Sequence, residues 1–468
     1  AFWPAELAAL GPSADRGLDG PPLSRNPLFA YWSAFWMKVA GVNDYGMALG
    51  NMLALALWVV ALYWAGLRLF DRRPALWSAG IWLSLPILQA GYVQYGYAEL
   101  LYGPMLLVLL VLLTESFSNA APQSPRRLLA LGILCGLAYL QRYSFALWLP
   151  LIAALPLLLR WQSPLRSGAW LFCGFLLPVL PWALWWRLAV GTAPSLPALQ
   201  LAEGVLSAAP IMDYRLTSLR DLASMDAALA LLSKAWQQFN RSLSDLPGMW
   251  NLELLFPFSA AAILFASGAQ RRFALLALAF FGWQLAAFSF LHYENLVFFG
   301  HRYSLWFSPV LLLFAADFLL EWTEKHGKAL ALAVLFLQVQ LMGSLYALRF
   351  MDMRSVGPGL DVSALPELRY ARENLPPGSR LLTNLPTQAA WYSDKPAVNI
   401  PNGLEDALAM MRRHRLDHLL LSAHPSGELN RFPAWIPVLR EDPRALAMLG
   451  AEVAARFPSG VVFKLRHE

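Results

Sequence analysis

Long apolar runs dominate the chain, and short basic loops separate them. A helix needs about 20 mostly apolar residues to cross a hydrocarbon layer of roughly 30 Å. On this criterion the pattern predicts an α-helical polytopic membrane protein with about ten transmembrane helices. The predicted spans are residues 46–69, 74–92, 97–114, 127–141, 143–160, 167–190, 251–267, 272–291, 303–321 and 329–348. The two short runs that flank Arg142 also fit one kinked unit.

The basic loops predict the orientation of these spans. If the spans alternate, every such loop lies on one side, which should be cytoplasmic because short cytoplasmic loops retain Lys and Arg. The residues concerned are Arg72 and Arg73, Arg126 and Arg127, Arg160 and Arg166, Arg271 and Arg272, and Lys325 and Lys328. Three long segments then fall on the outer side: residues 1–45, residues 191–250 and the segment after residue 348.

Two of the outer segments contain amphipathic patterns. In "NPLFAYWSAFWMKVAG" one helical face carries Phe29, Trp32, Phe35, Trp36 and Val39, which is typical of a helix lying in the membrane interface. In "ALALLSKAWQQFNRSL" apolar residues repeat at helical spacing, namely Leu229, Leu232, Trp236, Phe239 and Leu243. Packing against the protein is an alternative to lipid contact for both helices.

The composition changes after residue 348, so we predict a transmembrane domain over 1–348 and a small soluble α/β domain over 349–468. The stretches "SRLLTN", "KPAVNI", "LDHLLLS" and "GVVFKLR" are typical of short strands. Between them, "LEDALAMMRRHR" and "PRALAMLGAEVAARF" are typical of helices. Neither a dinucleotide fingerprint nor a phosphate loop occurs in this segment, which favours a supporting or recognition role.

Composition agrees with a membrane protein: 58% of the residues are hydrophobic and 14% are charged. The net charge of +6 does not indicate nucleic acid, because the basic residues sit mostly in short loops. Cys135 and Cys173 lie in apolar segments, so we expect small buried side chains and no disulfide. The residues from Ala1 to Pro27 have the character of a loop, and we expect one membrane helix before them.

Ionisable groups beside membrane spans are the candidate site, because they are costly in lipid unless paired or wetted. A carboxylate can act as a general base, and Arg presents a planar fork to a phosphate. The candidates are Asp15, Asp19 and Glu99 for catalysis, and Arg142, Arg187, Glu294, His301, Arg302 and Tyr303 for substrate binding. As alternatives, the arginines reach lipid headgroups, the aspartates are solvated turn residues and the histidines lie at the interface. The spacing matches no metal motif.

The same residues carry a resemblance to the GT-C superfamily of membrane glycosyltransferases, near its protein O-mannosyltransferase and aminoarabinose-transferase branch. The stretches involved include "DGPPLSRNPLFAYWSAFWMKVAG", "QYGYAELLYGPMLLVLL", "LLALGILCGLAYLQRYSFALWLP" and "HRYSLWFSPVLLLFAADFLLEW". The resemblance implies that Glu99 matches the family's second acidic position, and that Arg142 and Arg302 are phosphate-side cations. The family's leading Asp follows its first membrane helix, so the base lies upstream of Ala1 or is Asp15 or Asp19.

From this resemblance we expect transfer of a sugar from a polyprenyl-phosphate donor to a periplasmic lipid, glycan or protein acceptor. The protein is then a multi-pass protein of the bacterial inner membrane with its C-terminal domain in the periplasm. No cofactor is implied with certainty, and a divalent cation is compatible with the site. Two alternatives stay open: a non-catalytic GT-C-like subunit of a membrane complex, and a lipid or solute transporter.

Overall fold

The computed structural model describes most of the helical region and most of the C-terminal segment. The described residues are 27–41, 44–84, 99–118, 124–158, 163–190, part of 229–240, 254–290, 304–329, single positions in 334–338, 365–401, 403–424, 429 and 432–466. Six of the candidate site residues lie outside them: Asp15, Asp19, Glu294, His301, Arg302 and Tyr303.

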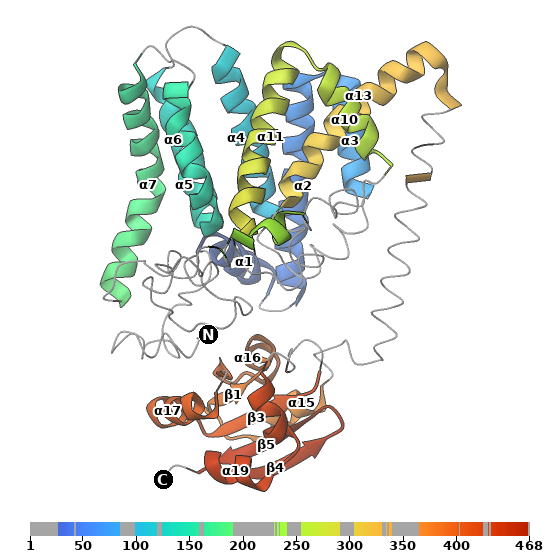
Figure 1. Cartoon of the computed structure of the whole chain (residues 1–468). Coiled ribbons are helices and arrows are strands. Elements are labelled where there is room, and N and C mark those ends of the chain that lie inside the picture. Colours follow the sequence, from blue (N-terminus) through green and yellow to red (C-terminus); the bar gives the residue numbers. More distant parts are fainter. Residues whose placement is uncertain are drawn as a thin grey trace.

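The described residues between 27 and 329 form a helical bundle (Figure 1). Its elements are α1 (Pro27–Ala40), α2 (Asp44–Leu69), α3 (Arg72–Ser84), α4 (Glu99–Ser118), α5 (Pro125–Gln141), η4 (Tyr143–Trp148), α6 (Leu149–Leu158), α7 (Pro164–Val190), α10 (Phe256–Phe265), α11 (Gly268–Ser289), η8 (Leu305–Phe307) and α13 (Ser308–His326). α5 and η4 are separate helices, so the two runs around Arg142 are not one unit.

Five helices in the described residues are long and apolar enough to cross a membrane. They are Gly46–Leu69, Glu99–Ser116, Pro164–Trp185, Gly268–Ser289 and Leu305–His326. Two shorter apolar helices, Tyr143–Leu157 and Phe256–Phe265, match further predicted spans. A polytopic helical architecture is therefore confirmed, whereas the expected number of ten is not.

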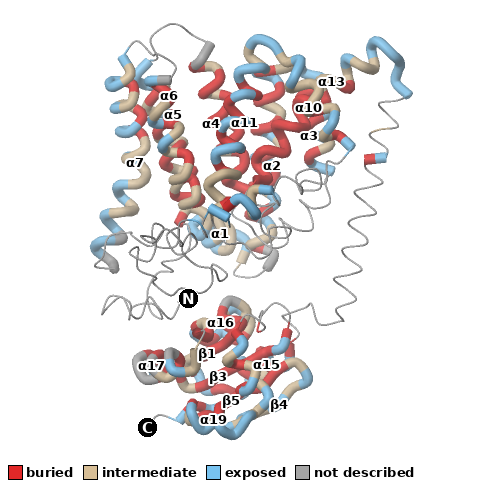
Figure 2. The backbone as a smooth tube through the Cα atoms, viewed as in Figure 1, coloured by how far each residue is buried: buried red, intermediate tan, exposed pale blue. Residues whose placement is uncertain are grey.

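α4 is the central helix of the bundle and α7 is peripheral. In the apolar stretch of α4, 78% is buried, against 17% in that of α7. The difference arises because α4 packs against α2, α5 and α11 together. Figure 2 shows the same contrast between the two helices. Large buried rings such as Trp58, Trp82 and Trp148 fill the core around α4. A polar side chain on α4 is consequently held in a well-defined place.

Glycines bring α5 and α7 into direct backbone contact. A Cβ added to Gly132 of α5 would lie 2.1 Å from the carbonyl oxygen of Leu171, and one added to Gly174 of α7 would lie 2.3 Å from that of Leu129. Since α7 packs through this face, its other faces are left exposed. Cys173 points that way and is exposed, so the expectation that both cysteines are buried is wrong for Cys173 and confirmed for Cys135.

Both predicted amphipathic helices are present at the described positions. In α1, the indole nitrogen of Trp32 donates to the carbonyl of Gly50 at 3.0 Å, while Tyr31 and Phe35 are exposed. Helix α1 thus packs on α2 through one face and leaves a second apolar face uncovered. In the other helix, Leu229, Leu232 and Trp236 are helical and exposed.

The C-terminal segment forms a five-stranded mixed sheet in the order β2-β1-β3-β5-β4. The strands are β1 (Leu381–Thr383), β2 (Ala397–Asn399), β3 (His418–Ser422), β4 (Ala451–Phe457) and β5 (Gly460–Leu465), and the helices include α15 (Pro366–Asn374), α16 (Pro386–Ser393), α17 (Leu404–His414) and α19 (Pro443–Leu449). β1 pairs in parallel with β2 and β3, whereas β5 pairs antiparallel with β3 and β4. All four predicted strands are confirmed.

The prediction of one helix over "PRALAMLGAEVAARF" is wrong in its second half. α19 ends at Gly450, which takes a positive φ of 59°, and residues 451–457 form β4. Alanines favour a helix locally, but alternate residues of β4 are exposed and the strand pairs with β5 along its length. Tertiary pairing therefore overrides the local preference.

A buried carboxylate ties α15 to the sheet. The two oxygens of Glu367 accept hydrogen bonds from the hydroxyls of Ser422 and Ser459, each at 2.6 Å. We expect Glu367→Ala to lower the local stability by about 2–3 kcal/mol, because both hydroxyls lose a charged partner. Hydrogen exchange of β3 and β5 in the full chain measures this. Glu373→Ala, which removes an exposed carboxylate of the same helix, is the control, and equal protection in both variants would contradict the prediction.

Candidate functional site

Glu99 is a buried acid at the first residue of α4. Its exposed fraction is 3%, and the helix that it begins continues as an almost wholly apolar run up to Leu113. A carboxylate in the first turn interacts favourably with the positive end of the helix dipole. That effect alone does not offset the desolvation of a charge, so a buried carboxylate of this kind needs a cation.

Arg142 supplies that cation. Its guanidinium makes a hydrogen-bonded ion pair with Glu99, and its own exposed fraction is 8%. The backbone of Arg142 is extended, with φ −155° and ψ 114°, and it separates α5 from η4. Because α5 ends at this extended residue, the side chain of Arg142 can reach the start of α4.

Aromatic packing fixes the helix that follows Arg142. The centroid of the Trp148 ring lies 4.8 Å from the ring centroid of Phe280 in α11 and 4.8 Å from that of Trp306 in η8. The indole nitrogen of Trp306 donates to the side-chain oxygen of Gln284 at 2.8 Å. On the other side, the ring of Phe145 meets that of Tyr102, one turn after Glu99. The ion pair is therefore held in a rigid frame.

The predicted site residues thus divide into three groups. Glu99 and Arg142 are brought together, although they are far apart in the sequence. Arg187, in the last turn of α7, is exposed and is not part of this pair. The remaining six are those outside the described residues. Within the part of the chain that is described, no three His, Cys, Asp or Glu side chains gather as they would around a metal ion.

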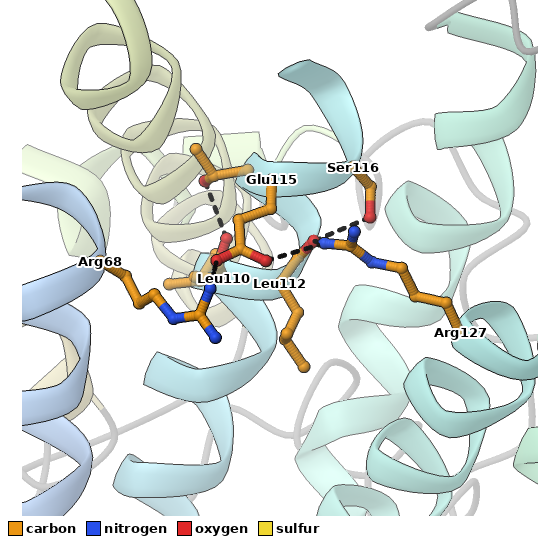
Figure 3. A network of polar contacts seen from close by, with 7 residues as sticks. Arg68, Leu110, Leu112, Glu115, Ser116 and Arg127 are labelled. Atoms are coloured by element: carbon orange, nitrogen blue, oxygen red, sulfur yellow. Dashed lines mark hydrogen bonds and ion pairs between the residues drawn. The ribbon is translucent and has the colours of Figure 1, made fainter. Parts of the chain in front are cut away.

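A second charged cluster lies at the other end of α4, where sequence reasoning proposed no site (Figure 3). Glu115 of α4 meets Arg68 of α2, at 3.3 Å between Oε1 and Nη1, and Arg127 of α5, at 2.9 Å between Oε2 and Nη2. Glu99 and Glu115 are 16 residues apart, which is about 24 Å along a helix axis. The arginine of the predicted basic loop before α5 was the only signal for this cluster.

A buried Arg–Glu pair at a helix end can hold a phosphate. The carboxylate orients the guanidinium, and a guanidinium has a planar fork of N–H groups whose geometry matches the oxygens of a phosphate. The arrangement suits an anionic substrate whose charge grows during reaction.

Comparison with known proteins places the pair in a family context. The family model described as dolichyl-phosphate-mannose-protein mannosyltransferase matches residues 21–186, which include both Glu99 and Arg142. The chain superposes on the crystal structure of ArnT from Cupriavidus metallidurans bound to undecaprenyl phosphate with a TM-score of 0.57, at 14% identity, covering 94% of this chain and 88% of that chain. Residues 21–186 therefore match this mannosyltransferase family, and the chain as a whole shares the fold of ArnT.

A second solved structure shares the fold, and a curated relative matches part of the sequence. The archaeal oligosaccharyltransferase AglB from Archaeoglobus fulgidus, in complex with an inhibitory peptide and a dolichol-phosphate, superposes with a TM-score of 0.53 at 14% identity, covering 91% of this chain and 64% of that one. An undecaprenyl phosphate-alpha-4-amino-4-deoxy-L-arabinose arabinosyl transferase of Pseudomonas aeruginosa is 35% identical over 166 residues. That match covers 34% of this chain and 30% of the relative's length, so the likeness is to part of each protein.

Proposed function

We propose that the protein transfers a sugar from a polyprenyl-phosphate donor to an acceptor at the outer face of the membrane. The observation that carries this proposal is the buried Glu99–Arg142 pair at the end of the central helix. The named relatives support the choice of donor, since the P. aeruginosa transferase is named for undecaprenyl phosphate-linked aminoarabinose and the C. metallidurans structure holds undecaprenyl phosphate.

In the proposed reaction, an acceptor hydroxyl or amine attacks the anomeric carbon as the bond from that carbon to the phosphate oxygen breaks. The bonding electrons leave with the lipid phosphate, whose negative charge increases. Arg142 stabilises that charge, and Glu99 keeps the guanidinium in place. The acceptor's proton goes to a base, for which Asp15, Asp19 or a residue before Ala1 stays the prediction. Arg302 and Tyr303 stay predicted donor contacts.

We further propose that the C-terminal sheet is periplasmic and lies on the same side as the reaction. In Figure 1 the sheet and α1 lie at one end of the bundle, opposite the first turns of α3 and α7. The first turns of these two helices carry the basic residues Arg72, Arg73 and Arg166, and basic residues beside short loops favour the cytoplasm. The donor phosphate would then meet Arg142 in the outer leaflet.

The direct test is incubation of the detergent-solubilised chain with polyprenyl-phosphate sugars that carry a radiolabel in the sugar. We expect label to move to an added acceptor or to water with at least one donor. The double variant Glu99→Leu/Arg142→Met is the matched control, because it removes the pair without leaving a lone buried charge. Absence of transfer, hydrolysis and binding with every donor would favour the non-catalytic subunit or the transporter.

A further inference from the structure

The cluster of Arg68, Glu115 and Arg127, named here the inner triad, has one more positive than negative charge. A single guanidinium is enough to neutralise Glu115, yet two reach it from opposite sides of α4 (Figure 3). The side chains of Glu115 and Arg127 are only 27% and 29% exposed. Surplus charge in such a partly desolvated place favours a further anion.

The guanidinium groups keep the donors that such an anion needs. Arg68 contacts Glu115 through Nη1 alone, and Arg127 contacts it through Nη2, which also donates to the carbonyl of Leu112 at 3.3 Å. Each guanidinium carries five N–H donors in a planar fork. The side chain of Arg68 is 54% exposed, so its remaining donors are accessible from outside the bundle.

Helix polarity adds to the attraction. Arg127 lies in the first turn of α5, where the helix dipole already creates positive potential. Glu115 lies near the end of α4, where a carboxylate is disfavoured by the dipole. Glu115 and Arg127 thus each lie at a helix end whose dipole disfavours their charge. An anion beside the start of α5 would be attracted both by the dipole of that helix and by the two arginines.

The depth of the triad identifies the kind of anion. Arg68 and Glu115 are in or near the last turns of two membrane-spanning helices, at the headgroup level. The Arg68 guanidinium lies 5.5 Å from the centre of the Trp64 ring, an arrangement typical of the membrane interface. We propose that the inner triad binds the phosphate of an anionic phospholipid in the leaflet opposite Glu99 and Arg142. This proposal does not depend on the proposed transferase activity.

Three single variants of the full chain in detergent test this lipid site. Native mass spectrometry measures how much phosphatidylglycerol binds relative to phosphatidylcholine. Each guanidinium charge near the surface changes the affinity for anionic lipid about fivefold. We expect Arg68→Gln to lower the phosphatidylglycerol preference by about that factor, and Glu115→Gln to raise it similarly, because the competing carboxylate is gone. Arg73→Gln, which removes an exposed arginine paired with Glu324, is the control and should change nothing.

The expected changes in phosphatidylglycerol preference are opposite for Arg68→Gln and Glu115→Gln, and this distinguishes a lipid-binding site from a purely structural contact. If the triad only holds α2, α4 and α5 together, Arg68→Gln and Glu115→Gln both lower the melting temperature and leave the lipid preference unchanged, which overturns the proposal. An equal loss of phosphatidylglycerol preference in Arg73→Gln also overturns the proposal, because the attraction would then come from the general positive charge of this end of the bundle and not from the triad. Inorganic phosphate that binds as tightly as phosphatidylglycerol would identify a soluble anion instead. If Glu115→Gln cannot be purified, the comparison of Arg68→Gln with Arg73→Gln decides.

Discussion

Arg142→Met is expected to lower sugar transfer by a factor of about 100 to 1,000, because the growing charge on the lipid phosphate loses its cation. The same variant should lower the stability by about 3–5 kcal/mol, since the buried carboxylate of Glu99 loses the cation that balances its charge. Glu99→Leu alone should cost a similar amount by leaving the guanidinium buried. Activity measured on either single variant therefore mixes two effects.

The double variant Glu99→Leu/Arg142→Met separates these effects. Replacing a buried ion pair by apolar side chains of similar volume is often neutral or stabilising. We expect thermal unfolding of the double variant in detergent to match the parent within about 1 kcal/mol, while transfer stays lost. A double variant that regains both stability and activity would assign the pair a purely structural role.

Gly174→Ala is the second change with a large expected effect. The new methyl group would lie 2.3 Å from the carbonyl oxygen of Leu129, and neither backbone can yield without separating α5 from α7. Overpacking of this kind costs roughly 1–3 kcal/mol. Because η4 follows α5 directly, the displacement should also disturb Arg142 and weaken donor binding.

Gly168 provides a control on the same helix. A Cβ at this position meets nothing within 4 Å, so Gly168→Ala should only add helix propensity and stabilise α7 by up to about 1 kcal/mol. The two alanine variants are thus expected to shift the melting temperature in opposite directions. Equal shifts would show that the contact between α5 and α7 does not limit the stability of the bundle.

The fold could be predicted from the sequence wherever one pattern dominates. Apolar runs such as those of α2, α4 and α7 locate membrane helices, because length and hydropathy alone satisfy the hydrocarbon layer. The strands β1 and β3 follow from short β-branched or leucine-rich runs between turn signals. β4 could not be located in this way, since its alanines favour a helix and only its partner β5 makes it a strand.

Glu99 and Arg142 could be predicted as candidate residues from the sequence, but their contact with each other could not. Glu99 and Arg142 each stand out because a charge is rare in an apolar segment. Their pairing depends on how α4 packs on α5 and on a helix break at Arg142 that no Gly or Pro announces. The inner triad was harder still, because Arg68 and Glu115 lie near helix ends, where charges are common and carry little information.

The separation of Glu99 from Arg142 by 43 residues has a consequence for biosynthesis. The chain is made from its N-terminus, so α4 emerges from the ribosome with its acid before the balancing base has been translated. Until then the start of α4 must stay in contact with water or headgroups. The two helices should therefore settle into the lipid as one hairpin, and a nascent chain stopped before Arg142 should leave α4 poorly inserted.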